Sequence, residues 1–139
     1  MDLKKYLGIP FRDHGASFDG CDCYGLVRLV YREEMGIELP HLGDEYSNAF
    51  ARREIGPLPM KTVQAGWAVD VTDKEPEQFD VLVFSRGGVE YHVGLFIYGE
   101  LMLHSIDGTD SCFEKWNGMR WKRQFSRRLR HVSRVREKA

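Results

Sequence analysis

The chain has 139 residues and a formal net charge of −1, with 42% hydrophobic and 29% charged side chains. This length and composition predict one folded domain over residues 1–139 and exclude an intrinsically disordered chain. Three cysteines are too few, and odd in number, for a disulfide framework. Residues 1–6 lack the apolar core of a signal peptide, and no apolar run is long enough to cross a membrane. We therefore expect synthesis in the cytoplasm and no membrane insertion.

The first predicted element is a helix over residues 23–35, which follows a loop over residues 8–20 that is rich in turn-forming residues. Asp22 or Asp19 is expected to cap the start of this helix, and Gly36 is expected to end it. Its apolar residues recur at helical spacing along one face, at Leu26, Val27, Val30, Tyr31 and Met35.

Residues 37–78 carry weaker signals. Residues 44–55 are compatible with a short helix that Gly56 would end. The segment 63–71 is expected to pack Trp67, at a position that the sequence does not define.

From Asp80 onward, short apolar runs separated by turns predict an antiparallel sheet. A strand over residues 81–84 leads into a turn over residues 85–88. Two further strands, over residues 91–98 and 101–106, flank a turn at Gly99. One helix followed by consecutive strands predicts an α+β fold, with the helix packed on one side of the sheet.

Residues 120–139 carry nine basic and one acidic side chain. A segment of this kind can bind nucleic acid or another anionic polymer. Because apolar residues such as Phe125, Leu129 and Val135 interrupt the charges, we instead predict a last strand with a solvated basic face, followed by a tail. We therefore expect no nucleic-acid partner.

Cys23 stands where the loop meets the predicted helix, which is a favourable place for a nucleophile. The first turn of a helix presents N–H groups and the positive end of the helix dipole, and both stabilise a thiolate. The same N–H groups can stabilise a tetrahedral oxyanion. The alternative is that Cys23 is a small buried hydrophobe, which is the commoner fate of a cysteine.

Two histidines on the predicted hairpin could serve Cys23. A three-residue turn over residues 98–100 would pair Ile97 with Leu101. In that register His92 and His104 project from the same face of the sheet as diagonal neighbours, within reach of each other. A two-residue turn would shift the register by one and place the histidines on opposite faces.

The same-face register yields a nucleophile, a base and an orienting group, which is the arrangement of hydrolytic triads. Gly94 would lie opposite His104 and leave space between the two rings. Cys23 would attack, His92 would take its proton, and His104 would hold the His92 ring. A zinc site built from Cys21, Cys23, His92 and His104 is the main alternative, but the Cys-x-Cys spacing is tighter than usual, so we predict no metal.

At these residues the sequence resembles the NlpC/P60 family of cell-wall cysteine peptidases. The segments D-C-x-G-L-V, at residues 22–27, and H-V-G, at residues 92–94, are fairly specific in combination. Residues 23–28 and 31–33 look most like the branch found in bacteriophage tail-assembly proteins and prophages. The resemblance covers residues 8–11, 18–27, 36–40, 80–84, 92–96 and 102–105.

The resemblance implies a trimmed papain-like α+β fold, with Cys23 as nucleophile, His92 as base and His104 as third polar residue, and without a cofactor. It implies cleavage of peptide bonds in peptidoglycan stem peptides, commonly between D-γ-glutamate and diaminopimelate. A phage-tail member is expected to be incorporated in the tail, near tail-tip proteins, and to open the wall locally. A structural tail-tip component with little or no hydrolase activity is the alternative.

The oxyanion site departs from the family pattern. Many members carry a tyrosine at the position of Phe11, and its hydroxyl is thought to assist the oxyanion. Phe11 cannot donate a hydrogen bond, so backbone N–H groups near Cys23, or another donor such as His14, must substitute. The residues expected at the oxyanion or substrate are Asp22, His14, Phe11 and Tyr24.

Three other features need an explanation. Tyr24 replaces the usual serine after the nucleophile, as in the phage branch. Phe79-Asp80 stands where many members have Gly-Asp at the start of the first strand of the sheet. Trp116 and Trp121, expected to be exposed, could help the basic segment to hold an anionic wall polymer.

Overall fold

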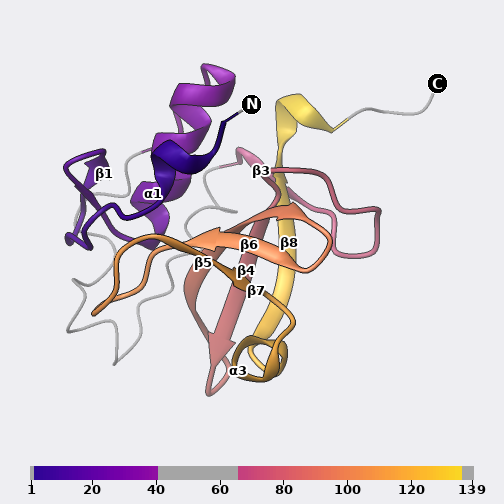
Figure 1. Cartoon of the computed structure of the whole chain (residues 1–139). Coiled ribbons are helices and arrows are strands. Elements are labelled where there is room, and N and C mark those ends of the chain that lie inside the picture. The colour runs from indigo at the N-terminus through magenta and orange to yellow at the C-terminus, as the bar shows by residue number, and fades with distance from the viewer. Residues whose placement is uncertain (1, 41–65, 136–139) are drawn as a thin grey trace.

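The computed structural model describes residues 2–40 and 66–135 (Figure 1). The predicted helix over residues 44–55 lies outside these ranges. In chain order, the helices and strands are η1 (Lys4–Tyr6), β1 (Ala16–Ser17), β2 (Gly20–Cys21), α1 (Cys23–Val30), η2 (Tyr31–Met35), β3 (Ala68–Asp70), β4 (Val81–Arg86), β5 (Val89–Tyr98), β6 (Leu101–His104), β7 (Cys112–Lys115), α3 (Met119–Lys122), β8 (Phe125–His131) and η5 (Val132–Arg134).

The predicted helix over residues 23–35 is confirmed as α1, which continues into η2, a π-helical segment. Gly36 ends it at φ 65°, a left-handed conformation that costs glycine little because it has no Cβ. Among the described residues, none of the helices combines the length and the apolar character that crossing a bilayer requires.

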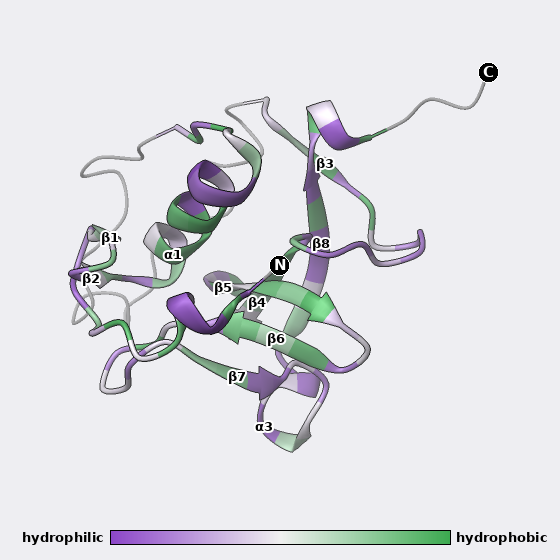
Figure 2. Ribbon diagram, turned by 45° about the horizontal axis from the view of Figure 1, so that its top comes forward, coloured by the Kyte–Doolittle hydropathy of each residue, from purple (hydrophilic) through white to green (hydrophobic). Residues whose placement is uncertain are grey.

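The sheet has six antiparallel strands in the order β3-β8-β4-β5-β6-β7. Helix α1 packs against it beside β5 (Figure 1). Much of β5 and β6 is hydrophobic in colour, and the helix alternates hydrophobic and hydrophilic bands (Figure 2). The main core lies between the apolar face of the helix and the sheet. The predicted α+β fold, a helix packed on an antiparallel sheet, is confirmed. The sheet supplies this core with Val81, Val83, Val93, Leu95, Ile97, Leu103 and Leu129.

The β5–β6 hairpin differs from its predicted register at the turn. Tyr98, not Ile97, pairs with Leu101, so the predicted pairing is wrong and the turn itself has two residues. Ile97 is an extra residue in β5, a β-bulge, and beyond it Leu95 pairs with Leu103, as the predicted register requires. The bulge therefore restores the same-face arrangement that a two-residue turn alone would have destroyed.

The basic C-terminal segment forms the predicted last strand, β8, but its expected solvated face is wrong. Arg128 and Arg130 are each only 5% exposed and flank Asp80, which is fully buried. The Nε atom of Arg130 lies 2.7 Å from Oδ1 of Asp80, and that of Arg128 lies 3.2 Å from Oδ2. Strand β8 is therefore strongly hydrophilic in colour although it lies between β3 and β4 inside the sheet (Figure 2).

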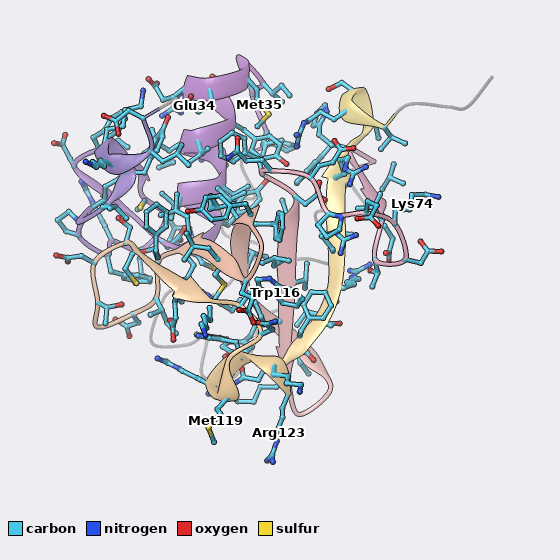
Figure 3. The ribbon with its side chains drawn as sticks, turned by 45° about the vertical axis from the view of Figure 1, so that its right-hand side comes forward. Glu34, Met35, Lys74, Trp116, Met119 and Arg123 are labelled. Atoms are coloured by element: carbon cyan, nitrogen blue, oxygen red, sulfur yellow. The ribbon has the colours of Figure 1, made fainter. Side chains whose placement is uncertain are left out.

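A smaller core covers the other side of the sheet, beneath α3. The expected exposure of Trp121 is wrong, because its ring is completely buried in this core with Phe84 and Met102. Met119 and Arg123 point away from the molecule at the same end of the sheet (Figure 3). Helix α3 therefore turns one large side chain inward and leaves its neighbours in solvent.

Phe79 adopts the left-handed conformation that glycine favours, at φ 74°. Such a conformation costs a non-glycine residue about 1–3 kcal/mol, and it persists only where surrounding contacts hold it. Here the ring is buried, the N–H donates to the carbonyl of Phe96 at 2.7 Å, and the carbonyl accepts from the hydroxyl of Tyr31 at 2.7 Å. These contacts explain how phenylalanine is held in a conformation that glycine adopts more easily.

Candidate active site

Asp22 caps the helix that begins with Cys23. One carboxylate oxygen accepts from the N–H of Gly25 at 2.7 Å, and the other accepts from the N–H of His14 at 2.8 Å. The carboxylate is completely buried. It therefore joins the preceding loop to the first turn of α1 and fixes the position of Cys23.

Gly25, two residues after Cys23, is required by the close approach of the same loop. A Cβ atom there would lie 1.6 Å from the carbonyl oxygen of Gly15, which itself accepts from the N–H of Asp22 at 3.2 Å. Any other side chain would push the loop away from the helix. The Asp-Cys-x-Gly segment is thus explained by a cap, a helix-start thiol and a backbone contact.

Cys23 lies at the first position of α1 and is 1% exposed. Helix α1 packs against β5, which carries His92. Burial raises the pKa of Tyr91, the neighbour of His92 in β5. Cys23 adds to this rise, and Arg86 and Arg120 oppose it. The contact between α1 and β5 thus places the helix that begins with the thiol beside the strand that carries His92.

The predicted same-face placement of the two histidines is confirmed. Nε2 of His92 lies 2.9 Å from Nδ1 of His104, and both side chains are buried. Gly94 makes this possible, because a Cβ there would lie 3.2 Å from Cβ of His104 and 3.0 Å from Sδ of Met102. This hydrogen bond is made by Nε2 of His92 and does not involve Nδ1, the second nitrogen of the ring.

Glu114 extends this pair to a chain of three groups, which no sequence pattern indicated. Its Oε1 atom lies 2.8 Å from Nε2 of His104. Strands β6 and β7 pair His104 with Cys112, which brings Glu114 to the diagonal position on the same face. The irregular segment between the strands hides this register from the sequence.

Burial lowers the pKa of His104 more than Glu114 raises it, which favours the neutral ring. A neutral ring carries one proton, and Glu114 favours that proton on Nε2. Nδ1 is then an acceptor and can receive a hydrogen bond from His92. The arrangement can therefore stabilise a protonated His92 ring.

Trp121 covers both histidines. Its ring stacks on His92 at 5.0 Å between centroids and 23° between planes, and meets His104 edge-on at 5.3 Å. An apolar cover of this kind excludes water and strengthens the hydrogen bond beneath it. This role was not predicted from the sequence, since nothing local distinguishes Trp121 from a surface residue.

The residues expected at the oxyanion make different contacts in the structure. The hydroxyl of Tyr24 donates to the carbonyl of Pro40 at 2.7 Å, and Phe11 is half-buried in a bridge with Cys21. His14 contributes its backbone N–H to Asp22 from a left-handed conformation at φ 62°. For these residues the structure gives packing or positioning contacts, and their oxyanion role stays a prediction.

The set first considered for zinc is not brought together in the described part of the chain. Burial raises the pKa of Cys21 to about 12. In the described ranges, the group whose donor atoms lie close enough to hold a metal ion is His104, Cys112 and Glu114, all within 4.8 Å of one another.

Comparisons with known proteins identify the family and the fold. The family model for the NlpC/P60 family matches residues 8–130. The chain is 24% identical over 130 residues to the murein DD-endopeptidase MepS/murein LD-carboxypeptidase of Escherichia coli strain K12. That alignment covers 93% of this chain and 59% of the relative, so the chain spans about three-fifths of the relative's length.

Two solved structures share the fold. The NlpC/p60 domain of the peptidoglycan hydrolase SagA superposes with a TM-score of 0.61 at 20% identity, covering 91% of this chain and 90% of that one. An NlpC/P60 family protein from Bacillus cereus ATCC 10987 superposes with a TM-score of 0.66 at 22% identity, covering 91% and 37%. The family match over residues 8–130 and the shared papain-like fold show that the chain belongs to the NlpC/P60 family.

Proposed function

We propose that the protein is a cysteine hydrolase that cleaves peptide bonds in the stem peptides of peptidoglycan, of the D-γ-glutamyl-diaminopimelate type. Family membership and the murein-cleaving relative support the substrate class. The observation that carries the proposal is the hydrogen-bonded chain from His92 through His104 to Glu114, next to a helix that begins with Cys23.

In the proposed mechanism Nδ1 of His92 takes the proton of Cys23, and the thiolate sulfur attacks the carbonyl carbon of the substrate. The tetrahedral oxyanion is stabilised by N–H groups in the first turn of α1. His92 then gives its proton to the leaving amine, which departs and leaves an acyl-enzyme. Water, deprotonated by His92, attacks the thioester and releases Cys23.

His104 and Glu114 act through His92. When His92 is protonated, its Nε2–H donates to Nδ1 of His104, whose own Nε2–H donates to Glu114. The carboxylate thereby fixes the tautomer of His104, as an acidic group does for a catalytic histidine in other hydrolases. Trp121 keeps this chain dry from one side.

We expect Cys23 to ionise well below the value of about 8.5 that is typical of a thiol. The measurement is the ultraviolet absorbance of the thiolate against pH, taken as the difference between the protein and its Cys23→Ala variant. This readout does not require a reagent to reach a buried sulfur. Burial raises the pKa of Cys21 to about 12 and raises that of Cys112, so neither thiol interferes near neutral pH.

His92→Ala should move the ionisation of Cys23 back toward that of an ordinary thiol, because the imidazolium partner is lost. If Cys23 titrates like an ordinary thiol in the unaltered protein, the hydrolase proposal fails. A structural role in the tail tip, which Phe11 also favours because it lacks the family's hydroxyl, would then replace it.

Glu114→Gln is expected to lower kcat/KM about tenfold, which corresponds to a rise of about 1.4 kcal/mol in the activation free energy. Glutamine keeps the size of the side chain but loses the charge that holds the proton of His104 on Nε2. The effect stays moderate because the Glu114 side chain is 35% exposed to solvent. Steady-state hydrolysis of a muropeptide measures it, with Glu100→Gln, an exposed carboxylate at the adjacent turn, as the control. Equal effects of the two substitutions would contradict the role of Glu114.

The setting in which this activity is used is proposed to be a bacteriophage or prophage tail. The resemblance of residues 23–28 and 31–33 to the phage branch supports this placement. Tail-tip proteins would then be partners, and the enzyme would open the wall locally during infection. Mass spectrometry of purified particles tests the placement, which fails if the protein is absent from tails that its own prophage produces.

A further inference from the structure

A second set of reactive groups lies on the far side of His104 from His92. Strand β7 is an edge strand of the sheet. Its pairing with β6 places Cys112 directly opposite His104, with Glu114 at the diagonal position. One ring nitrogen of His104, the Sγ atom of Cys112 and a carboxylate oxygen of Glu114 lie within 4.8 Å of one another. The nitrogen of His104 that faces Glu114 is Nε2, at 2.8 Å from Oε1. His104 is 1% exposed, whereas Cys112 is half-buried and Glu114 is open to solvent on one side.

We propose that His104, Cys112 and Glu114 form a zinc-binding site, and that zinc bound there switches off the proposed nucleophile. Imidazole, thiolate and carboxylate are the ligands that zinc prefers, and three protein ligands leave the fourth tetrahedral position to water. Bond lengths of about 2.0–2.3 Å imply donor atoms about 3.3–3.8 Å apart. The three donor atoms now lie within 4.8 Å of one another. Small side-chain movements would bring them to the distances that zinc requires, because the ligands come from neighbouring strands.

The charges also suit a divalent cation. Thiolate and carboxylate together supply two negative charges, which zinc neutralises, and Cys112 releases its proton to solvent when it binds. Arg120 opposes binding, since its charge acts on both Cys112 and His104. The Arg120→Gln variant should therefore bind zinc more tightly than the unaltered protein.

Occupation of the site would change the direction of the hydrogen bond to His92. Zinc on Nε2 of His104 leaves the proton of that ring on Nδ1, which must then donate to Nε2 of His92. His92 in turn carries its own proton on Nδ1, the nitrogen that the proposed mechanism needs as a base. His92 then accepts no proton from Cys23, and the thiol stays protonated.

Binding is tested with cobalt, which replaces zinc and gives a thiolate-to-metal absorption band. The Cys23→Ala protein is used, so that a band cannot arise from the proposed nucleophile. We expect one equivalent of cobalt to produce the band and one equivalent of zinc to abolish it. The band should vanish in Cys23→Ala/Cys112→Ser and persist in Cys23→Ala/Cys21→Ser, with circular dichroism confirming the fold of each. A band that survives loss of Cys112, or no band in Cys23→Ala, would overturn the proposal.

The switch rests on the proposed function and is tested separately. In the unaltered protein, the zinc concentration that fills the site should suppress the thiolate absorbance of Cys23, and in Cys112→Ser it should not. Suppression in both proteins would mean that zinc binds at Cys23 itself, which contradicts the switch. An ordinary titration of Cys23 in metal-free protein would instead refute the hydrolase proposal and leave the cobalt result standing.

Discussion

Cys23→Ala should reduce the hydrolysis of peptidoglycan peptides by about 10⁴–10⁶-fold, to the level that binding alone supports. The substitution removes the sulfur that forms the acyl-enzyme and replaces it with a methyl group. The helix should be unaffected, since its cap is the carboxylate of Asp22 and its close contact is made by Gly25. The loss of activity is measured by chromatography of the soluble fragments that the protein releases from purified peptidoglycan.

The same experiment contains two internal checks. Cys21→Ala removes a second buried thiol two residues away, and it should retain activity within a few-fold, because that thiol is not expected to ionise. His92→Ala should be nearly as inactive as Cys23→Ala, and the double variant no slower than either, because the two groups act as one unit. Substantial hydrolysis by Cys23→Ala would show that this residue is not the nucleophile.

Asp80→Ala is expected to lower the free energy of unfolding by about 3–5 kcal/mol, the cost of removing one partner from a buried ion pair. Asp80 is fully buried and is the shared partner of Arg128 and Arg130. Without it, both guanidinium groups lose their buried carboxylate partner, and the ion-pair partner that Arg130 keeps in the described part of the chain, Glu77, is 53% exposed. Urea denaturation followed by circular dichroism gives the change directly.

Glu77→Ala is the matched control for Asp80→Ala. Glu77 also faces Arg130, at 3.3 Å, but its side chain is 53% exposed. Its removal should therefore cost less than about 1 kcal/mol, as for other exposed ion pairs. Equal losses from the two variants would mean that the buried cluster does not hold β8 in the sheet.

This cluster also bears on the basic C-terminal segment. Arg128 and Arg130 are matched by Asp80, and Arg127 forms an ion pair with Glu90 at 2.7 Å. These arginines therefore stabilise the sheet from within, and they are not presented to a polymer. A count of basic residues overstated the charge that this segment offers to a partner, because counting ignores which carboxylates the fold brings alongside.

The local elements of this protein could be predicted from sequence because their causes are local. The apolar spacing of residues 23–35, Asp22 as cap and Gly36 as stop depend on neighbours within one or two turns. The short apolar runs after Asp80 likewise predicted β4, β5 and β6, although β5 begins at Val89 and β6 ends at His104. Strand periodicity allowed two registers for the hairpin, one of which puts His92 and His104 on the same face. The bulge at Ile97 is what selects that register although the turn has two residues.

Tertiary structure decided what depends on contacts between distant segments. The bulge at Ile97 set the hairpin register, and the pairing of β6 with β7 brought Glu114 to His104. The packing of α3 placed Trp121 over both histidines. Sequence periodicity fixes which residues share a face, but not which strands become neighbours or where an extra residue enters. Those choices follow from the packing of the whole sheet, and so Glu114 and Trp121 could be identified as neighbours of His104 only in three dimensions.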